Sequence, residues 1–170
     1  MAGATLAGEA QAVARGRSGW YHTGDGVMTT SVLFIDVDVL AVGHDMKCMP
    51  EHRSKAEVVA ADCDKRFVWR ALRDIDKKTI HESLRKGYKT VDYGNDAKVR
   101  RALSAFTSKL AEGTRVIISY DAAAKSTTLA PERGGDKVTV AGDDFMRATW
   151  SILFANPELG ELGDALVSKL

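Results

Sequence analysis

The chain has 170 residues and a mass of 18.4 kDa, which is enough for one domain with a hydrophobic core and too little for two ordinary domains. Its 24 lysines and arginines nearly balance its 23 aspartates and glutamates, so the formal net charge is +1 and nucleic acid is not a predicted partner. The hydrophobic fraction is 45%, and no apolar run reaches the roughly 20 residues that a transmembrane segment needs.

The N-terminal segment, residues 1–19, is rich in alanine and glycine, and we expect it to be flexible and to precede a single domain over residues 20–170. It lacks the basic start and the long apolar run of a signal peptide. The sequence as given therefore predicts a cytoplasmic protein, or a periplasmic one if an export signal has been removed. It predicts no oligomeric state.

Two segments in the first half of the chain have the pattern of β-strands. Residues 29–42, TTSVLFIDVDVLAV, are rich in β-branched residues and predict one long strand after a segment that ends in glycines. Asp36 and Asp38 would share one side of it, which we interpret as a solvated face, with acid–base catalysis or Ca²⁺ binding as the alternative. Residues 65–74 alternate between apolar and charged side chains, which predicts a half-buried strand whose aromatic side faces the core.

Two helices are expected next. Residues 76–91 have helical spacing, with Asp74 or Asp76 as the N-terminal cap. Residues 95–113 predict a second helix that ends at Gly113. The apolar residues expected to face the core are Ile80, Leu84, Tyr88 and Val91 in the first helix and Val99, Leu103, Phe106 and Leu110 in the second.

The rest of the chain predicts a meander of three strands followed by two helices. Asp143 or Asp144 is expected to cap a helix that ends at Asn156, and a leucine-rich helix closes the chain. This element order predicts an α+β domain in which helices pack on one face of an antiparallel sheet. The three expected strands are residues 114–122, 126–130 and 137–142.

Few residues have the spacing of a metal or nucleotide site. Cys48 and Cys63 have no CxxC pattern, so neither a zinc site nor a disulfide scaffold is indicated, and a single disulfide between them stays an open alternative. No glycine-rich phosphate loop is present. We interpret one cluster of soft ligands as a chance assembly in a loop, with copper or haem iron as the alternative; its members are His44, Met46, Cys48 and Met49.

Trp69 and Trp150 are the two aromatic residues that stand out. Trp69 is expected to point from its strand toward the helices, and Trp150 to lie off the helix face formed by Phe145, Thr149 and Ile152. The two indoles either pack in the core or form the roof of an apolar cleft between sheet and helices, where a flat hydrophobic ligand fits.

The order of these segments resembles the chalcone isomerase-like family, in particular its bacterial and fungal members. Residues 24–43, GDGVMTTSVLFIDVDVLAVG, resemble the family's glycine-valine-arginine segment and its long strand, and residues 65–88 resemble the strand, arginine-aspartate and helix that follow. Residues 102–145 resemble the helix, glycine and meander. Residues 145–170, with a Trp, an Asn-Pro and a leucine-rich helix, resemble the closing signature and are the most specific part.

The resemblance implies an open-faced β-sandwich with a ligand cleft between a large antiparallel sheet and its helices. Members of the family cyclise chalcones, bind fatty acids or bind haem, and these activities use an arginine in the glycine-valine-arginine segment. Here that position is Met28, which carries no charge and donates no hydrogen bond. Arg70 and Arg147 are the residues that could replace the arginine in space.

The leading hypothesis is a non-catalytic chalcone isomerase-like protein whose cleft is either filled by side chains or holds an apolar ligand such as a fatty acid. One alternative is a haem-binding protein that uses His22 and His44, with Met46 beside them, near the cleft entrance. The other is an intramolecular lyase or isomerase with an unknown substrate. No required cofactor and no metal site is predicted. The predicted ligand-binding residues are Met28, Trp69, Phe106, Thr149, Trp150 and Ser151, of which Thr149 or Ser151 supplies the family's pocket hydroxyl.

Overall fold

The computed structural model describes residues 19–32 and 35–170. Of the predicted flexible segment 1–19, all but residue 19 lies outside the described residues. No helix in the described ranges combines the length and the apolar character needed to cross a bilayer.

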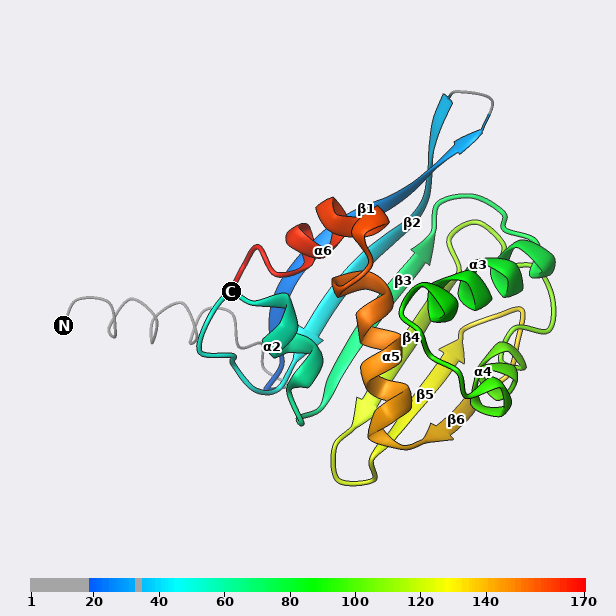
Figure 1. Cartoon of the computed structure of the whole chain (residues 1–170). Coiled ribbons are helices and arrows are strands. Elements are labelled where there is room, and N and C mark those ends of the chain that lie inside the picture. The colour runs from blue at the N-terminus through cyan, green and yellow to red at the C-terminus, as the bar shows by residue number, and fades with distance from the viewer. Residues whose placement is uncertain (1–18, 33–34) are drawn as a thin grey trace.

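Six strands form one antiparallel sheet in which each strand pairs with its neighbours in the sequence (Figure 1). The pattern of one-sided burial fits a sheet that is covered on one face, because side chains alternate along each strand. The strands are β1 Tyr21–Val32, β2 Ile35–Met46, β3 Lys65–Ala71, β4 Arg115–Asp121, β5 Ser126–Pro131 and β6 Val138–Ala141.

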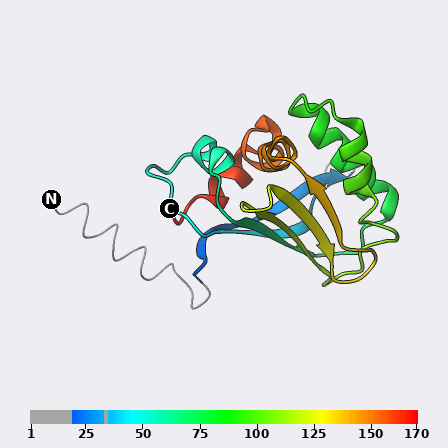
Figure 2. The same ribbon diagram turned by 90° about the horizontal axis from the view of Figure 1, so that it is seen from below.

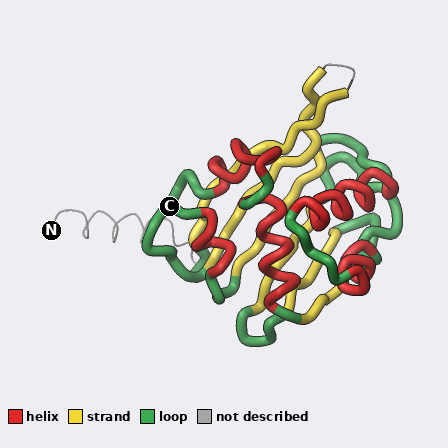
Figure 3. Tube along the Cα trace, viewed as in Figure 1, coloured by secondary structure: helices red, strands yellow, loops and turns green. Residues whose placement is uncertain are grey.

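The helices all lie on one face of this sheet, and the other face carries none of them (Figure 2). The arrangement confirms the predicted α+β class with an open-faced antiparallel sheet. Figure 3 shows α5 running across the middle of the sheet, with α3 and α4 on one side of it and α2 and α6 on the other. The helical elements are α2 Lys55–Ala60, α3 Lys77–Thr90, α4 Asp96–Leu103, α5 Asp143–Phe154, the 3₁₀ turn η1 Pro157–Leu159 and α6 Gly160–Leu166.

The prediction of one long strand over residues 29–42 is wrong. Two strands occupy this region, and they pair antiparallel with Val32 opposite Ile35. The glycines that suggested an irregular segment lie inside β1, where they let α6 approach the sheet: a Cβ at Gly24 would lie 2.1 Å from the carbonyl oxygen of Ala165. Of the expected carboxylate pair, Asp38 is exposed, and the side chain of Asp36 lies outside the described part.

The prediction of a single helix over residues 95–113 is also wrong. Helix α4 ends at Leu103, and the chain continues through turns and two isolated β-bridges, with Phe106 opposite Gly135 and Leu110 opposite Ile75. Phe106 and Leu110, the apolar residues that suggested a longer helix, are buried outside α4. Gly135 lets its segment approach this part of the chain, because a Cβ there would lie 1.8 Å from the carbonyl oxygen of Ala105, so only glycine allows the contact.

The two predicted helix caps differ in outcome. Asp76 caps α3 as expected, since its Oδ1 accepts a hydrogen bond from the Thr79 backbone N–H at 2.8 Å. Neither Asp143 nor Asp144 caps α5: the N-cap position is Gly142, and both aspartates lie in the first turn, where they interact favourably with the helix dipole.

Cys48 and Cys63 form a disulfide bond, which decides the alternative that their spacing left undetermined. The bond closes a loop that contains α2, a helix that the sequence pattern did not predict. It also removes Cys48 from the cluster of soft ligands.

Candidate functional site

A cavity of about 290 Å³ lies between the sheet and the helical layer formed by α3, α5 and η1. Its volume is at the lower end of the range of small-molecule sites, ~300–1,000 Å³. Most of its wall is aliphatic or aromatic. The apolar lining residues are Met28, Val39, Leu40, Phe67, Trp69, Ile75, Ile80, Leu84, Leu110, Ile118, Leu129, Ile152, Leu153 and Leu159, and the polar ones include Ser83, Tyr88, Thr149 and Asn156.

Two hydroxyl groups in this wall are paired with each other. The Tyr88 hydroxyl lies 2.9 Å from Thr149 Oγ1, and Thr149 in turn donates to the Phe145 carbonyl oxygen at 2.8 Å, so the tyrosine is the donor of the pair. Burial raises the pKa of Tyr88 well above its ordinary value, although the bond to Thr149 opposes this shift. Tyr88 therefore stays protonated at neutral pH and provides no general base.

Charged side chains line the cavity only at its edge, as far as the described residues show. Lys86 and Glu158 form an ion pair, with 3.4 Å between Nζ and Oε2. Both side chains are exposed, so solvent screens the pair and it contributes little to stability. The interior of the cavity is therefore lined by uncharged groups.

Trp69 is the cavity residue with an unsatisfied polar group. The residue is 8% exposed, and its indole Nε1 is buried without a hydrogen-bond partner among the described residues. Thr127 Oγ1 is the other such atom in that part of the chain, and Thr127 does not line the cavity. A buried donor without an acceptor costs free energy, so a functional reason for it is expected.

The structure brings together three of the predicted ligand-binding residues. Met28, Trp69 and Thr149 line the cavity. Phe106, Trp150 and Ser151 do not: Phe106 and Trp150 are buried elsewhere in the core, and Ser151 is half-buried on α5. Thr149 is thus the hydroxyl of the cavity.

Trp150 is fully buried, and its ring centroid lies 4.8 Å from that of Phe67. We call this part of the core, formed by Trp150, Phe67 and His44, the sealed end. There its Nε1–H donates to His44 Nε2 at 2.9 Å, which leaves the proton of the neutral imidazole on Nδ1. His44 Nδ1 then donates to Thr23 Oγ1 at 2.7 Å, and Thr23 donates to the Leu166 carbonyl at 2.6 Å. This chain of hydrogen bonds joins α5, β2, β1 and α6.

His44 is unsuited to bind a haem iron in this arrangement, since both ring nitrogens are occupied and the ring is buried. Burial lowers the pKa of His44 to about 3, and the charge of Lys65 contributes in the same direction. The expectation that His22 and His44 lie near the cleft entrance is wrong. They lie at the Tyr21–Met46 end of the β1–β2 pair, whereas the cavity is lined by the part around Met28 and Leu40.

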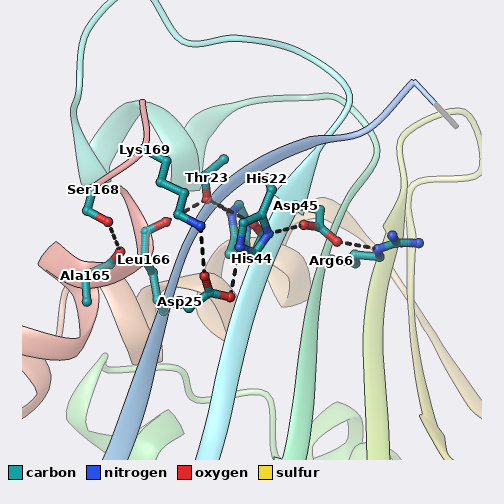
Figure 4. A network of polar contacts seen from close by, with 10 residues as sticks. All are labelled: His22, Thr23, Asp25, His44, Asp45, Arg66, Ala165, Leu166, Ser168 and Lys169. Carbon is teal, nitrogen blue, oxygen red and sulfur yellow. Dashed lines mark hydrogen bonds and ion pairs between the residues drawn. The ribbon is translucent and has the colours of Figure 1, made fainter. Parts of the chain in front are cut away.

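His22 lies on the uncovered face of the sheet, between two carboxylates (Figure 4). Its Nδ1 lies 2.7 Å from Asp45 and its Nε2 lies 2.8 Å from Asp25. Partial burial lowers the pKa of His22, but hydrogen bonds and attraction from the two aspartates outweigh burial and raise it overall. Arg66 Nε donates to Asp45 at 2.9 Å, and Lys169 Nζ lies 3.1 Å from Asp25, so the C-terminal end is tied to β1.

Neither arginine that could replace the missing one reaches the cavity. Arg70 is exposed and lines an open hollow on the uncovered face of the sheet, together with His22 and Asp25. Arg147 is exposed on α5 and lies 3.7 Å from Asp143. Neither guanidinium group therefore supplies in the cavity the positive charge that Met28 lacks.

Among known proteins, no family model and no curated sequence matches the chain. A solved structure does: a fatty-acid binding protein of Arabidopsis thaliana, with a TM-score of 0.72 and 16% identity, over 91% of this chain and 89% of that one. The fold is chalcone isomerase-like. At this identity the similarity establishes the fold, and the ligand must be argued from the cavity.

The part of α3 that lines the cavity was not predicted as part of the site. Ile80, Leu84 and Tyr88 were expected on the inward face of this helix, but as core residues rather than as site residues. The signal was the hydroxyl of Tyr88 within an otherwise apolar stripe, because a buried tyrosine needs a partner such as Thr149.

Proposed function

We propose that the protein binds an apolar small molecule, such as a fatty acid, in the cavity between the sheet and the helices, without catalysing a reaction on it. The observation that carries the proposal is the apolar interior of about 290 Å³ with an uncharged lining and a few fixed hydroxyl groups. Burial of an alkyl chain there is favourable by about 0.8 kcal/mol for each methylene group.

Two further observations support binding without catalysis. The family's arginine position is Met28, and Arg70 and Arg147 lie outside the cavity wall, so a developing oxyanion would lack a guanidinium partner, and the lysine of the wall is exposed and paired with Glu158. The phenol of Tyr88 has a raised pKa and donates its proton to Thr149, so it is not a base. The likeness in fold to a protein described as fatty-acid binding agrees with this role.

We also propose that the chain is related to the bacterial and fungal members of the chalcone isomerase-like family. The support is the closing segment, residues 145–170, where the tryptophan, the Asn-Pro and the leucine-rich helix occur in the family's order.

A substitution that fills the cavity tests the proposal. Leu84 is half-buried in the cavity wall, and Leu72 is half-buried outside it, so Leu84→Trp and Leu72→Trp make the same change inside and outside the site. Native mass spectrometry of the purified protein identifies any molecule that copurifies. Calorimetric titration with undecanoic acid and with 2-undecanone then measures the affinity of each variant.

We expect the wild type and Leu72→Trp to bind at least one of the two compounds. Leu84→Trp should bind at least about tenfold more weakly, because the added ring occupies ligand volume. Thermal unfolding checks that both variants are folded. A folded wild type that binds neither compound and carries no copurified molecule contradicts the proposal, as does equal affinity in the two variants.

A further inference from the structure

The buried indole N–H of Trp69 indicates which class of ligand the cavity takes, and this inference rests on the proposed function. A tryptophan is a donor only, so its Nε1–H can be satisfied only by an acceptor. The protein provides none among the described residues. Trp150, on the same covered side of the sheet, has its acceptor in His44, so the fold is able to satisfy an indole where no ligand is involved.

The other polar groups of the cavity do not need a ligand in the same way. Tyr88 donates to Thr149, and Thr149 donates to a backbone carbonyl, so both hydroxyl protons are used. What these groups leave available is oxygen lone pairs, which repel an anion. Ser83 and Asn156 also carry donors in this wall, but the Trp69 N–H is the buried donor of the lining that has no acceptor among the described residues.

The charges around the cavity disfavour a buried carboxylate. Lys86, the lysine of the wall, is exposed and paired with Glu158, so an anion at the mouth would meet a carboxylate beside the ammonium group. An ionised carboxylate inside would lose its hydration and gain one neutral hydrogen bond in return. That exchange is unfavourable, because the desolvation of an ion costs several kcal/mol.

We propose that the cavity selects uncharged ligands that carry one hydrogen-bond acceptor, such as a ketone, an ester or a protonated acid on an apolar body, and that Trp69 Nε1–H is the donor to that acceptor. The hydrogen bond satisfies a group that the described residues of the protein leave unpaired. Ligand binding therefore gains the interaction at a site where the protein already bears the desolvation cost.

A pair of ligands with similar chain length and shape tests this selectivity. At about pH 8, where a carboxyl group is ionised, calorimetry compares 2-undecanone with undecanoate on the wild type and on Trp69→Phe. The substitution keeps an aromatic ring in the wall and removes the N–H. Trp20→Phe serves as the matched control, because the indole of Trp20 lies outside the cavity wall.

We expect the wild type to bind the ketone at least about tenfold more tightly than the carboxylate. Trp69→Phe should weaken ketone binding about fivefold, the effect of one net hydrogen bond, and Trp20→Phe should leave it unchanged. Equal or tighter binding of undecanoate, or an unchanged ketone affinity in a folded Trp69→Phe, overturns the selectivity and leaves the proposed function standing. Failure of both compounds to bind contradicts the proposed function itself.

Discussion

Two indoles on the covered face of the sheet have opposite surroundings. Trp150 is fully buried, packs against Phe67 with the two rings tilted and donates its N–H to His44. Trp69 is nearly as buried, yet it lines the cavity and its N–H has no acceptor among the described residues. The same residue type thus stabilises the fold at one place and is poised for a ligand at the other. A buried polar group without a partner is the more informative of the two, because folding alone does not account for it.

The disulfide bond joins two residues that lie outside the cavity wall and should affect stability alone. Replacing both Cys48 and Cys63 by serine removes the closure of a loop with a sequence separation of 15 residues, which in the chain-entropy account costs about 3 kcal/mol. Urea unfolding with and without the substitutions measures this loss. The affinity for 2-undecanone should stay the same, since neither cysteine lines the cavity. A loss of affinity in the folded variant would show that the disulfide-closed loop and the cavity are coupled.

The same substitution at the two indoles should give different costs in stability. Trp150→Phe leaves His44 Nε2 without its donor and should lower the free energy of unfolding by about 2 kcal/mol. Trp69→Phe removes a donor that is already unpaired, so its cost should be smaller, about 1 kcal/mol or less. Urea unfolding of both variants checks the difference. Equal losses of unfolding free energy in the two variants would contradict the distinction between the two indoles.

His44 and His22 should titrate on opposite sides of the ordinary histidine pKa, His44 below it and His22 above it. The pKa of His44 is lowered to about 3 in the folded protein, so between pH ~6.5 and ~3 the unfolded chain binds a proton that the folded state does not bind. Stability should therefore fall by about 1.4 kcal/mol for each pH unit as pH drops through that range. His22 has a raised pKa, so its contribution is complete below pH ~6.5 and is lost as pH rises through the folded pKa.

Imidazole resonances in an NMR pH titration separate these two contributions. The His44 signal should stay that of a neutral ring down to about pH 4, and the His22 signal should change above pH ~6.5. A His44 that titrates near pH ~6.5 would show that its hydrogen bonds to Trp150 and Thr23 do not persist in solution.

Local patterns in the sequence predicted the fold class because most elements obey simple periodicities. The alternation in β3 and the stripe of α3 gave the correct buried faces, and Asp76 gave the start of α3. The errors arose where glycine serves packing rather than a turn. Gly24 in β1 and Gly135 beside Ala105 permit close backbone contacts that only the folded chain shows.

The site was harder to predict than the fold, for a physical reason. The prediction of which α5 residues face the sheet was wrong. Phe145, Thr149 and Ile152 contact α3, whereas Trp150, which was expected off that face, contacts side chains of β2 and β3. The helix is buried on several sides by α2, α3 and α6. Whether a buried indole lines a cavity or packs behind Phe67 depends on neighbours from distant strands. An unsatisfied hydrogen bond is a property of three-dimensional surroundings, so no sequence spacing encodes it.

The most direct test of the account is a ¹H–¹⁵N NMR spectrum of the tryptophan indoles during titration with 2-undecanone. The three signals belong to Trp20, Trp69 and Trp150, and the phenylalanine variants of each assign them. The Trp69 N–H signal should move downfield on binding, as expected for a new hydrogen bond, while the Trp150 signal should stay in place. A Trp69 signal that does not move while the ligand binds would contradict the central claim.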